Sequence, residues 1–567
     1  MTQHADSAMA DFDAIVVGSG ITGGWAAKEL TERGLKVLLV ERGPLIEHQS
    51  GYTNEVTPPW DMPFRGFGDP RLNASDYPVQ SKGMHFTEWS RDHFVNDREN
   101  PYQTTKDNPF QWRRGYQLGG RSLTWGRQCY RWSDLDFSAN AKDGHGVDWP
   151  IRYADLKPWY DHVENFIGVS GSLEGLPQLP DGIFQPAMKL NVVEQAFKDR
   201  IAATYDDRRL IIGRSSNMTQ DKPGRTKCQY RNICARGCSF GGYFSTQSST
   251  LPAARATGRL TLVTDALVES LEYDPARRRV TGVRVIDTKN RAPRVYRSQI
   301  VFLCAGSVNS ISLLLRSAND AMPRGLANSS GVLGRYFMDH ALALSVTAKV
   351  PGFEGHAYFG NRPCSLVIPR FINVAGATDG LLRGYSYQGN ATRRGWADGI
   401  GLPGMGKALK HDVGHAGDWT ILLGAFAECL PVASNRVTLD HMNRDPFGLP
   451  QTKIEFAYGD NERKLLAHAL QEAKAMLALM NAEILSETAE PGPPGGAVHE
   501  MGGARMGRDP TTSVLNAHNQ THDIENLFVT DGAAMASSAC QNPSLTYMAL
   551  TARAAAFAAN QLKTGAL

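Results

Sequence analysis

A glycine-rich motif near the start of the chain limits the possible folds more than any other feature. Residues 14–17 form a β-branched run that predicts a buried strand, and a Gly-x-Gly-x-x-Gly sequence made of Gly18, Gly20 and Gly23 follows directly. Apolar residues at helical spacing come next, and residues 37–40 predict a second buried strand. In such a unit the first glycine allows a tight turn, the second lets the backbone approach a pyrophosphate, and the third lets the helix pack on the strand. The motif therefore predicts an α/β unit that binds a dinucleotide.

An acidic residue at the end of the second predicted strand supports the same interpretation. Glu41 lies 18 residues after Gly23, where it can accept hydrogen bonds from the ribose hydroxyls of an adenosine. The N-terminus of the predicted helix would face the phosphates with its free N–H groups. The motif itself does not distinguish NAD from FAD, but its place at the beginning of the chain favours FAD by analogy with known folds.

Composition and charge exclude several classes of protein. The chain has 567 residues, which at roughly 150 residues per domain allows about three to four domain-sized units. Hydrophobic residues make up 42% and charged residues 21%, as in ordinary soluble proteins, and a net charge of +3 gives no reason to expect nucleic acid as a partner. No apolar run approaches the roughly 18 residues of a membrane span. Residues 1–13 lack a basic region and an apolar region, so we expect no secretion signal in the chain itself.

Periodicity outlines the rest of the chain. Residues 44–110 are rich in Pro, Gly, Asn and Asp and predict a long loop region that serves as a lid or an interface. The Pro- and Gly-rich residues 491–496 predict a linker. The other predicted elements are helices over 153–167 and from Asp460 onwards, and strands around Val263 and over 280–286, 300–304, 419–427 and 453–458.

Motifs at the C-terminus point to a known family. They are a His-Glu-Met-Gly-Gly sequence that starts at His499, an Asp-Gly pair at residues 531–532, and an Asn-Pro-Ser-Leu-Thr sequence that starts at Asn542. Together with the first glycine motif, the Gly-Gly pair at 119–120 and the Cys-Ala-Gly sequence at 304–306, they resemble the glucose–methanol–choline (GMC) oxidoreductases. The resemblance implies an FAD-dependent enzyme that oxidises alcohols or sugars. It also implies an α/β fold in which a discontinuous Rossmann-like FAD-binding domain carries an inserted α+β substrate domain built on an antiparallel sheet.

The resemblance divides the chain into alternating parts of these two domains. We expect FAD-binding parts at 1–150, 211–335 and 491–567, and substrate-domain parts at 151–210 and 336–490.

The resemblance also implies the catalytic residues. His499 matches the active-site histidine of the family, and Asn542 matches its partner position, which is either His or Asn. A neutral imidazole suits the removal of a hydroxyl proton near neutral pH, while the hydride goes to N5 of the flavin. Asn542 cannot titrate but can hold the hydroxyl by hydrogen bonding. Glu500 is either a second acid or a structural residue, the latter being favoured, and we expect His340 to serve packing or turn geometry.

The cofactor is expected to be noncovalent FAD. Some family members attach FAD through a histidine near the second glycine pair, and residues 119–126 contain none. The helix that follows the Asn542 turn would place its N-terminus where it stabilises negative charge on reduced flavin. The expected FAD-binding residues are Gly18, Gly20, Gly23, Glu41, Gly119, Gly120, Val263, Ala305, Gly306, Asp531, Gly532, Asn542, Pro543 and Ser544.

Three cysteines need an explanation of their own. Cys228, Cys234 and Cys238 lie on one short segment that resembles the cluster segment of membrane-linked bacterial sugar dehydrogenases of this family, in which three cysteines hold a [3Fe-4S] cluster. Soft thiolates suit iron–sulfur better than a hard cation, and zinc would need a fourth ligand. The alternative is that these thiols are merely packed or free. The other five cysteines are expected to be core residues: Cys129, Cys304, Cys364, Cys429 and Cys540.

The sequence thus predicts an FAD-dependent sugar dehydrogenase of the GMC type, and residues 228–252 favour a glucoside 3-dehydrogenase catalytic subunit. Electrons would leave through the cluster to a cytochrome or another acceptor. The resemblance implies a small signal-bearing partner subunit and periplasmic export with it, with a cytoplasmic location as the alternative. Two other functions stay open: a sugar or C-glycoside oxidase without iron–sulfur, and a catalytically inactive flavin-binding interaction subunit.

Overall fold

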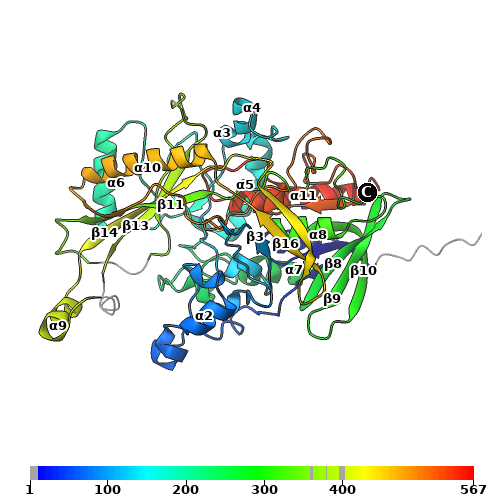
Figure 1. Cartoon of the computed structure of the whole chain (residues 1–567), viewed down its shortest axis with the longest axis horizontal. Helices are drawn as coiled ribbons and strands as arrows, with labels where there is room; N and C mark the ends of the chain where they lie inside the picture. The colour runs from blue at the N-terminus through cyan, green and yellow to red at the C-terminus, as the bar shows by residue number, and fades with distance from the viewer. Residues whose placement is uncertain (1–10, 358–361, 379, 395–401) are drawn as a thin grey trace, which may run out of the picture.

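The computed structural model describes residues 11–357, 362–378, 380–394 and 402–567. Most of the N-terminal segment that we expect to hold no secretion signal, residues 1–10, lies outside these ranges. Two large sheets organise the described chain, and Figure 1 shows them side by side along the long axis of the molecule.

The first sheet has a parallel core extended by an antiparallel hairpin. Its strand order is β7-β2-β1-β10-β9-β8, and β18 pairs with the far half of β10. The parallel strands are β7 (Leu260–Val263), β2 (Val37–Val40), β1 (Phe12–Val17), β10 (Pro293–Leu303) and β18 (Leu527–Val529). The hairpin of β8 (Ala266–Asp274) and β9 (Arg279–Asp287) pairs with the first half of β10. Strands β2 and β18 and residues 14–17 of β1 are buried, as their continuous apolar runs predict, whereas β7 at the edge of the sheet is partly exposed.

Helices rich in small residues cover this sheet. Helix α1 (Ile21–Glu32) packs against helix α11 (Ser544–Lys563), the last helix of the chain. Alanines on both helices are fully buried in one apolar cluster with the strands, among them Ala26, Ala27 and Ala555. Because alanine has a minimal side chain, the two helices approach closely and bring the two ends of the chain together on one layer.

The second sheet is antiparallel throughout, with the order β17-β11-β14-β13-β12-β6. Its strands are β17 (Glu483–Glu487), β11 (Ala341–Val350), β14 (Trp419–Ala427), β13 (Tyr385–Arg393), β12 (Leu366–Ile368) and β6 (Ile211–Ile212). Helix α10 (Asp460–Ala478) packs on it through a stripe of buried residues that includes Leu466, Ala469 and Ala473. Because β6 belongs to this sheet, the domain boundary that we predict at residue 211 falls inside it.

Two segments differ from the structure that the sequence predicts for them. The strand expected over 453–458 is β16 (Pro450–Glu455), because the backbone N–H and C=O of Ala457 bond to the side chain of Asn435 instead of a neighbouring strand. The segment 44–110 holds several short helical turns and one α-helix, α2 (Pro70–Asp76), rather than a featureless loop.

The remaining elements are short or peripheral. Strand β16 pairs with β15 (Arg436–Arg444) and β3 (Gln103–Thr104), and helix α5 (Tyr153–Ile167) has the bounds that periodicity predicts. The others are α3 (Asp134–Phe137), α4 (Ala139–Asp143), α6 (Val192–Thr204), α7 (Leu251–Ala256), α8 (Ser307–Arg316), α9 (Gly406–Gly414), β4 (Val169–Ser170) and β5 (Phe184–Gln185).

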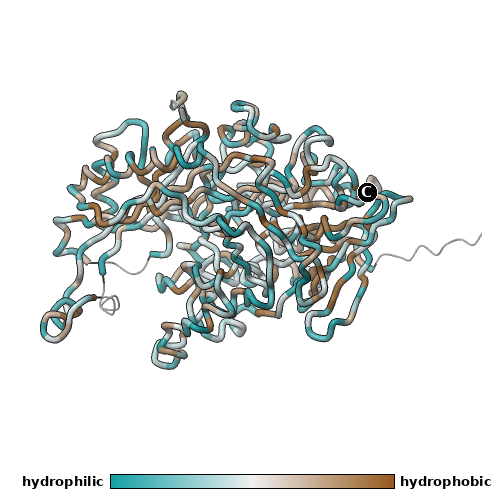
Figure 2. The backbone as a smooth tube through the Cα atoms, viewed as in Figure 1, coloured by the Kyte–Doolittle hydropathy of each residue, from teal (hydrophilic) through white to brown (hydrophobic). Residues whose placement is uncertain are grey.

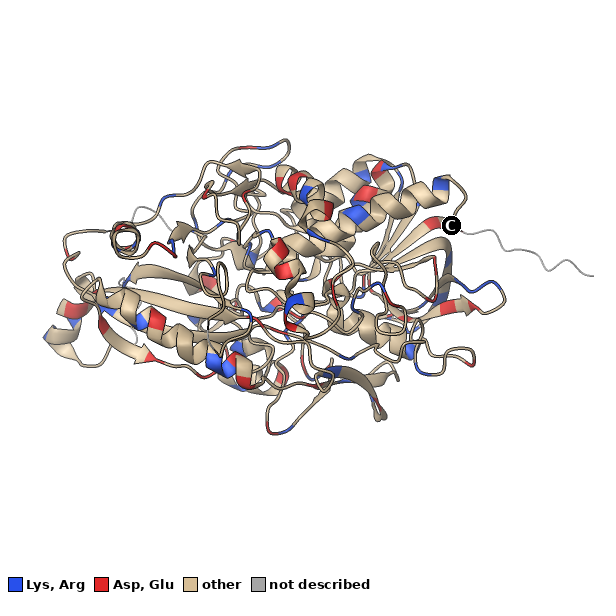
Figure 3. Cartoon of the chain, turned by 90° about the horizontal axis from the view of Figure 1, so that it is seen from above, with Lys and Arg blue, Asp and Glu red and all other residues tan. Residues whose placement is uncertain are grey.

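One apolar core runs through both sheets. A single cluster of buried side chains includes Ile15 and Leu303 of the first sheet and Ile421 and Leu423 of the second. Figure 2 shows the apolar segments concentrated along these inner strands and helices. In Figure 3, basic and acidic residues are interspersed over the elements in view, in keeping with the small net charge of +3. Within the described ranges, no helix is both long enough and apolar enough to span a membrane.

Candidate active site

The carboxyl ends of the parallel strands open into a large cavity. It has a volume of about 1080 Å³ and extends to the inner face of the antiparallel sheet. Val17 ends β1, Val40 ends β2 and Cys304 follows β10, and all three line the cavity. Ligands of open parallel sheets bind at this edge, where successive turns diverge.

The glycine turn between β1 and α1 is built as its sequence predicts. Gly18 adopts a φ of +89°, which L-residues with side chains rarely adopt. A Cβ atom on Gly23 would overlap the carbonyl oxygen of Gly18, so the close contact between helix and turn requires glycine there. A Cβ on Gly20 would meet no atom within 4 Å, and Gly20 lines the cavity beside the N-terminus of α1. The turn therefore leaves room for a group that approaches the backbone, as a pyrophosphate does.

We expect Gly23→Ala to lower flavin content sharply and to lower the free energy of unfolding by about 1–3 kcal/mol, because the added methyl group forces α1 away from the turn. The measurements are bound flavin per protein and the thermal unfolding temperature. Gly355→Ala is the matched control, since a Cβ at Gly355 meets nothing within 4 Å and leaves φ unstrained. Full flavin content in the Gly23 variant would contradict the tight contact.

Glu41 follows β2 and its carboxyl group is buried at the cavity wall. One carboxylate oxygen accepts hydrogen bonds from the backbone N–H of Ser19 (3.1 Å) and its hydroxyl (2.5 Å), and the other accepts one from the N–H of Gly43 (2.9 Å). Burial raises the pKa of Glu41, and these hydrogen bonds act against that shift. Val263 does not line the cavity; its carbonyl oxygen accepts the backbone N–H of Glu41 at 2.8 Å and so fixes the end of β2.

The other predicted cofactor residues surround the same space. Gly119 donates its N–H to the hydroxyl of Ser19 at 2.8 Å, and this contact joins the second glycine pair to the first turn. Asp531 accepts the N–H of Gly306 at 2.9 Å and the hydroxyl of Ser310 at 2.5 Å. Burial raises the pKa of Asp531 to about 6. Of the predicted set, the residues that line the cavity are Gly18, Gly20, Glu41, Gly120, Ala305, Gly306, Asp531, Gly532, Asn542 and Ser544, whereas Gly23, Gly119, Val263 and Pro543 do not line it.

His499 and Asn542 meet on one wall of the cavity. The Nε2 atom of His499 lies 3.1 Å from the amide nitrogen of Asn542, and the amide oxygen of Asn542 accepts a hydrogen bond from Gln388 at 2.5 Å. The backbone N–H of His499 donates to the carboxylate of Asp339 at 2.9 Å. Burial lowers the pKa of His499 well below its ordinary value, and the nearby His340 and Arg121 act in the same direction. At neutral pH His499 is therefore a neutral base.

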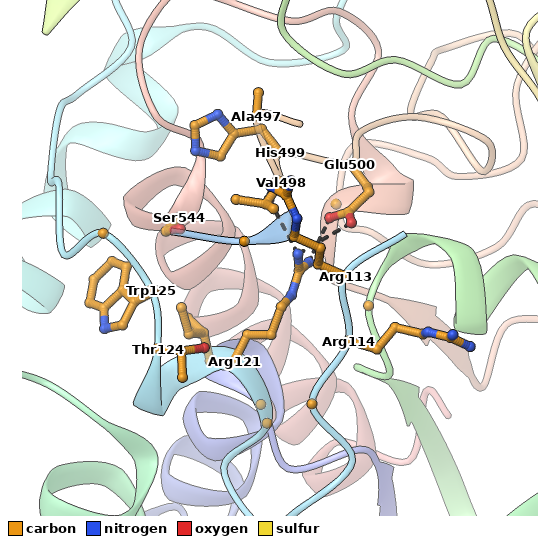
Figure 4. Close-up of a pocket in the computed structure, with 18 of the residues that line it drawn as sticks. Arg113, Arg114, Arg121, Thr124, Trp125, Ala497, Val498, His499, Glu500 and Ser544 are labelled. Atoms are coloured by element: carbon orange, nitrogen blue, oxygen red, sulfur yellow. Dashed lines mark hydrogen bonds and ion pairs between the residues drawn. The ribbon is translucent and has the colours of Figure 1, made fainter. Parts of the chain in front are cut away.

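The structure assigns Glu500 a structural role rather than that of a second acid. Its carboxylate is buried and receives both terminal nitrogens of Arg121, at 2.6 and 3.2 Å, as the dashed lines in Figure 4 show. A bidentate pair of this kind holds the segment that carries His499 against the turn that carries Arg121. Arg121 was not singled out in the sequence, where nothing links it to a residue nearly four hundred positions away.

His340 and Gln388 also belong to the site, although the sequence does not assign them to it. The Nδ1 atoms of His340 and His499 lie 2.7 Å apart, so the expectation that His340 serves packing or turn geometry is incomplete. His340 lies directly before β11 and Gln388 lies within β13, and both strands belong to the antiparallel sheet. No spacing pattern links either residue to the C-terminal motif; only the way the two sheets meet brings them together.

The predicted linker, residues 491–496, follows β17 of the antiparallel sheet and runs along the cavity to the segment of His499. The N–H of Gly492 donates to the carbonyl of Leu342 at 2.8 Å, and the N–H of Gln111 donates to the carbonyl of Pro494 at 2.7 Å. Pro491, Gly492, Pro493 and Gly496 line the cavity. Its many Pro and Gly residues fit a tight path along the site rather than a flexible connection.

These residues fit FAD. An open approach at Gly20, the N-terminus of α1 and a buried carboxylate at Glu41 match a pyrophosphate and a ribose, and the cavity continues from there to His499. A flavin bound in this way supplies a hydride acceptor to the histidine end of the cavity.

The three clustered cysteines line a second, small cavity of about 20 Å³. Each sulfur has an N–H donor: the backbone of Tyr230 to Cys228 at 3.4 Å, the side chain of Asn217 to Cys234 at 3.9 Å, and Arg231 to Cys238 at 3.9 Å. Burial raises the pKa of Cys228 to about 11 and also raises that of Cys238.

In the part of the chain that the structure describes, no three or more His, Cys, Asp or Glu side chains are grouped to hold a metal ion. A single ion needs all its ligand atoms at bonding distance from one point, whereas several irons and sulfides join thiolates that are spaced further apart. The three thiols therefore share one small cavity, but the described residues do not group them as the ligands of a metal ion. The other five cysteines are buried, as predicted.

Comparisons with known proteins identify the family of the chain. Residues 12–342 and 431–551 match the N-terminal and C-terminal regions of the GMC oxidoreductases. The chain is 28% identical to 2-methyl-1,2-propanediol dehydrogenase of Mycolicibacterium austroafricanum, over 98% of this chain and 95% of that protein. It is 27% identical to the fructose dehydrogenase large subunit of Gluconobacter japonicus, over 98% of both chains. It is 26% identical to paromamine 6'-oxidase of Streptomyces fradiae, over 97% of this chain and 92% of that protein.

A solved structure shares the fold. Pyridoxine 4-oxidase from Mesorbium loti superposes with a TM-score of 0.61 at 18% identity, over 96% of this chain and 98% of that one. Because the matched regions cover most of the chain, the protein belongs to the GMC oxidoreductase family and is an FAD-dependent oxidoreductase.

Proposed function

We propose that the protein is a dehydrogenase that oxidises a secondary hydroxyl of a sugar or glycoside to a ketone. The observation that carries the proposal is the pair formed by His499 Nε2 and the Asn542 amide, 3.1 Å apart on the wall of the large cavity. Two relatives, one named for fructose and one for paromamine, support the substrate class: the fructose dehydrogenase large subunit and paromamine 6'-oxidase. A catalytically inactive flavin-binding subunit would not need these two side chains side by side.

The two side chains have separate roles in this reaction. His499 accepts the hydroxyl proton at Nε2, because burial keeps its imidazole neutral at neutral pH. The Asn542 amide has a second N–H that can donate to the substrate oxygen and hold it in place. The flavin, when bound, takes the hydride from the carbon at N5.

The start of helix α11 has an electrostatic role in the same step. Asn542 and Pro543 precede the helix, and Ser544 is its first residue and lines the cavity. The free N–H groups of a helix N-terminus carry partial positive charge, which favours a flavin that has gained negative charge.

We further propose that Cys228, Cys234 and Cys238 hold an iron–sulfur cluster through which electrons leave for a cytochrome or another acceptor. When bound, such a cluster transfers electrons one at a time. Asn232 supports this role, because it lines both the large cavity and the small cysteine cavity, so the two sites share a wall. The same proposal includes a small signal-bearing partner subunit with which the protein is exported to the periplasm. It also includes oxidation of glucosides at the 3-position.

An oxidase without iron–sulfur is the second candidate. Oxidases among the similar proteins, such as paromamine 6'-oxidase, favour it. The two candidates differ in the acceptor, so oxygen consumption against cytochrome reduction separates them.

The function is tested by mixing the purified holoprotein anaerobically with D-fructose, D-glucose, methyl α-D-glucopyranoside or sucrose and following the flavin absorbance near ~450 nm. We expect at least one of these sugars to bleach the flavin band, with a keto product that lacks two hydrogens. If none of the four bleaches it while a simple diol does, the sugar assignment is wrong. The spectrum of the resting protein also reports a broad iron–sulfur shoulder.

Acid precipitation is expected to release the flavin into the supernatant, because residues 119–126 contain no histidine that could form a covalent bond to it. The measurement is the absorbance of pellet and supernatant after precipitation, with a covalent flavoprotein as the control. A yellow pellet would contradict noncovalent binding.

A further inference from the structure

A chain of hydrogen bonds leads away from the catalytic histidine to a backbone carbonyl. His340 is fully buried, and its Nδ1 atom lies 2.7 Å from Nδ1 of His499. The Nε2 atom of His340 contacts the carbonyl oxygen of Ala539. On the other side of His499, the Nε2 atom faces the amide of Asn542 at 3.1 Å.

The carbonyl group of Ala539 determines which atom donates in each of these hydrogen bonds. A carbonyl oxygen only accepts, so Nε2 of His340 carries a proton. A neutral His340 then has a bare Nδ1, which can only accept, so the proton between the two rings belongs to Nδ1 of His499. His499 is consequently left with a bare Nε2, and that is the atom that faces the cavity.

We propose that His340 is a positioning residue that holds His499 in the tautomer with an unprotonated Nε2, which accepts a hydrogen bond from the Asn542 amide. The proposal rests on the proposed function insofar as His499 is the base. It assigns a role to a buried histidine on the antiparallel sheet that neither its own motif nor the C-terminal motif explains.

The environment of His340 and His499 favours the neutral form of both imidazole rings. Burial lowers the pKa of His340 to about 4. The ring of Phe426 lies 6.1 Å from that of His340 and 5.9 Å from that of His499, between centroids, so one side of the pair is apolar. At neutral pH both imidazoles are therefore neutral, and the direction of the hydrogen bonds follows from the carbonyl.

The remaining partners cannot set the tautomer by themselves. The amides of Asn542 and Gln388 can each turn over and exchange donor for acceptor, so they suit either tautomer of His499. Without an acceptor at position 340, a turned Asn542 would accept a proton from Nε2, and the base would be blocked. The carbonyl of Ala539 can only accept a hydrogen bond. Because it contacts His340 and not His499, it fixes the tautomer of His499 only through the ring of His340.

Two substitutions separate this role from packing. In His340→Gln, the amide oxygen can accept a hydrogen bond from Nδ1 of His499 while the amide N–H₂ donates to the carbonyl of Ala539. The direction of both hydrogen bonds is therefore kept. In His340→Leu, both hydrogen bonds are lost while the side chain stays bulky and apolar. Tyr458→Phe is the matched control, because the Tyr458 hydroxyl donates only to the backbone carbonyl of His340, at 2.9 Å.

The first readout is the rate of flavin reduction in an anaerobic stopped-flow experiment, with the sugar that bleaches the wild-type flavin fastest. We expect His340→Leu to reduce the limiting rate by about 10²-fold or more with little change in the sugar concentration needed for half saturation. His340→Gln should lose less than about 10-fold, and Tyr458→Phe should stay close to wild type. Equal losses in the Leu and Gln variants would overturn the proposal.

The second readout is the tautomer itself, from ¹⁵N spectra of histidine-labelled protein, in which protonated and bare ring nitrogens differ strongly in shift. The His499 signal is identified by its absence in His499→Ala. In the wild type we expect a protonated Nδ1 and a bare Nε2, and in His340→Leu a mixed or reversed pattern. A protonated Nε2 in the wild type would overturn the proposal, even if the His340 variants failed to fold. Because these spectra need no substrate, they stay informative if no sugar reduces the flavin.

Discussion

Replacement of His499 by alanine is expected to lower the rate of flavin reduction by substrate about 10²–10⁴-fold while FAD stays bound. The loss follows from the position of Nε2 beside Asn542 in the cavity, since no other base adjoins that amide among the hydrogen-bond partners that the structure describes. The glycine turn and Glu41 that are expected to hold the adenosine end are untouched. Stopped-flow reduction under anaerobic conditions measures the rate, and the flavin content of the purified variant measures binding.

His441→Ala is the control, because His441 is exposed on β15 and lies outside the cavity residues. It should reduce its flavin at the wild-type rate. Wild-type reduction by the His499 variant would show that another group removes the hydroxyl proton, and it would remove the basis of the proposed mechanism.

Replacement of Cys234 by serine is expected to abolish turnover with a cytochrome acceptor while sugar still reduces the flavin. Iron-bound thiolates act as a set, so the loss of one is expected to lose the cluster. Proton and hydride removal depend on His499, Asn542 and the flavin, which lie around the other cavity. The measurements are iron and acid-labile sulfide content, anaerobic flavin reduction and cytochrome-linked turnover on the same preparation.

Cys429→Ala is the matched control, since Cys429 is buried and lies outside the residues of the small cavity. It should keep both iron and cytochrome turnover. Wild-type protein that binds no iron after anaerobic reconstitution would rule out the cluster. It would also shift the preference to the oxidase, leaving the prediction for His499 intact.

The elements that the sequence predicts well are those whose determinants are local. The strand–turn–helix unit around Gly18, Gly20 and Gly23 depends on backbone angles and contacts within a few residues, so it could be recognised without the rest of the chain. Helix α5 likewise has the bounds that its periodicity predicts. Strand β16 ends early because a side chain distant in sequence, that of Asn435, takes the hydrogen bonds of Ala457.

The residues of the candidate site also fall into those that sequence motifs indicate and those that only the fold brings together. The motifs that resemble a known family suggest His499 and Asn542 as candidate site residues and indicate the class of chemistry, since these residues stand in short, recognisable segments. Only the tertiary structure placed His340 and Gln388 of the antiparallel sheet beside them, and Arg121 beside Glu500. The reason is physical: a motif records which residue types a segment needs, but the polarity and the tautomer of a buried base depend on atoms that only the packing of two sheets brings within hydrogen-bonding distance.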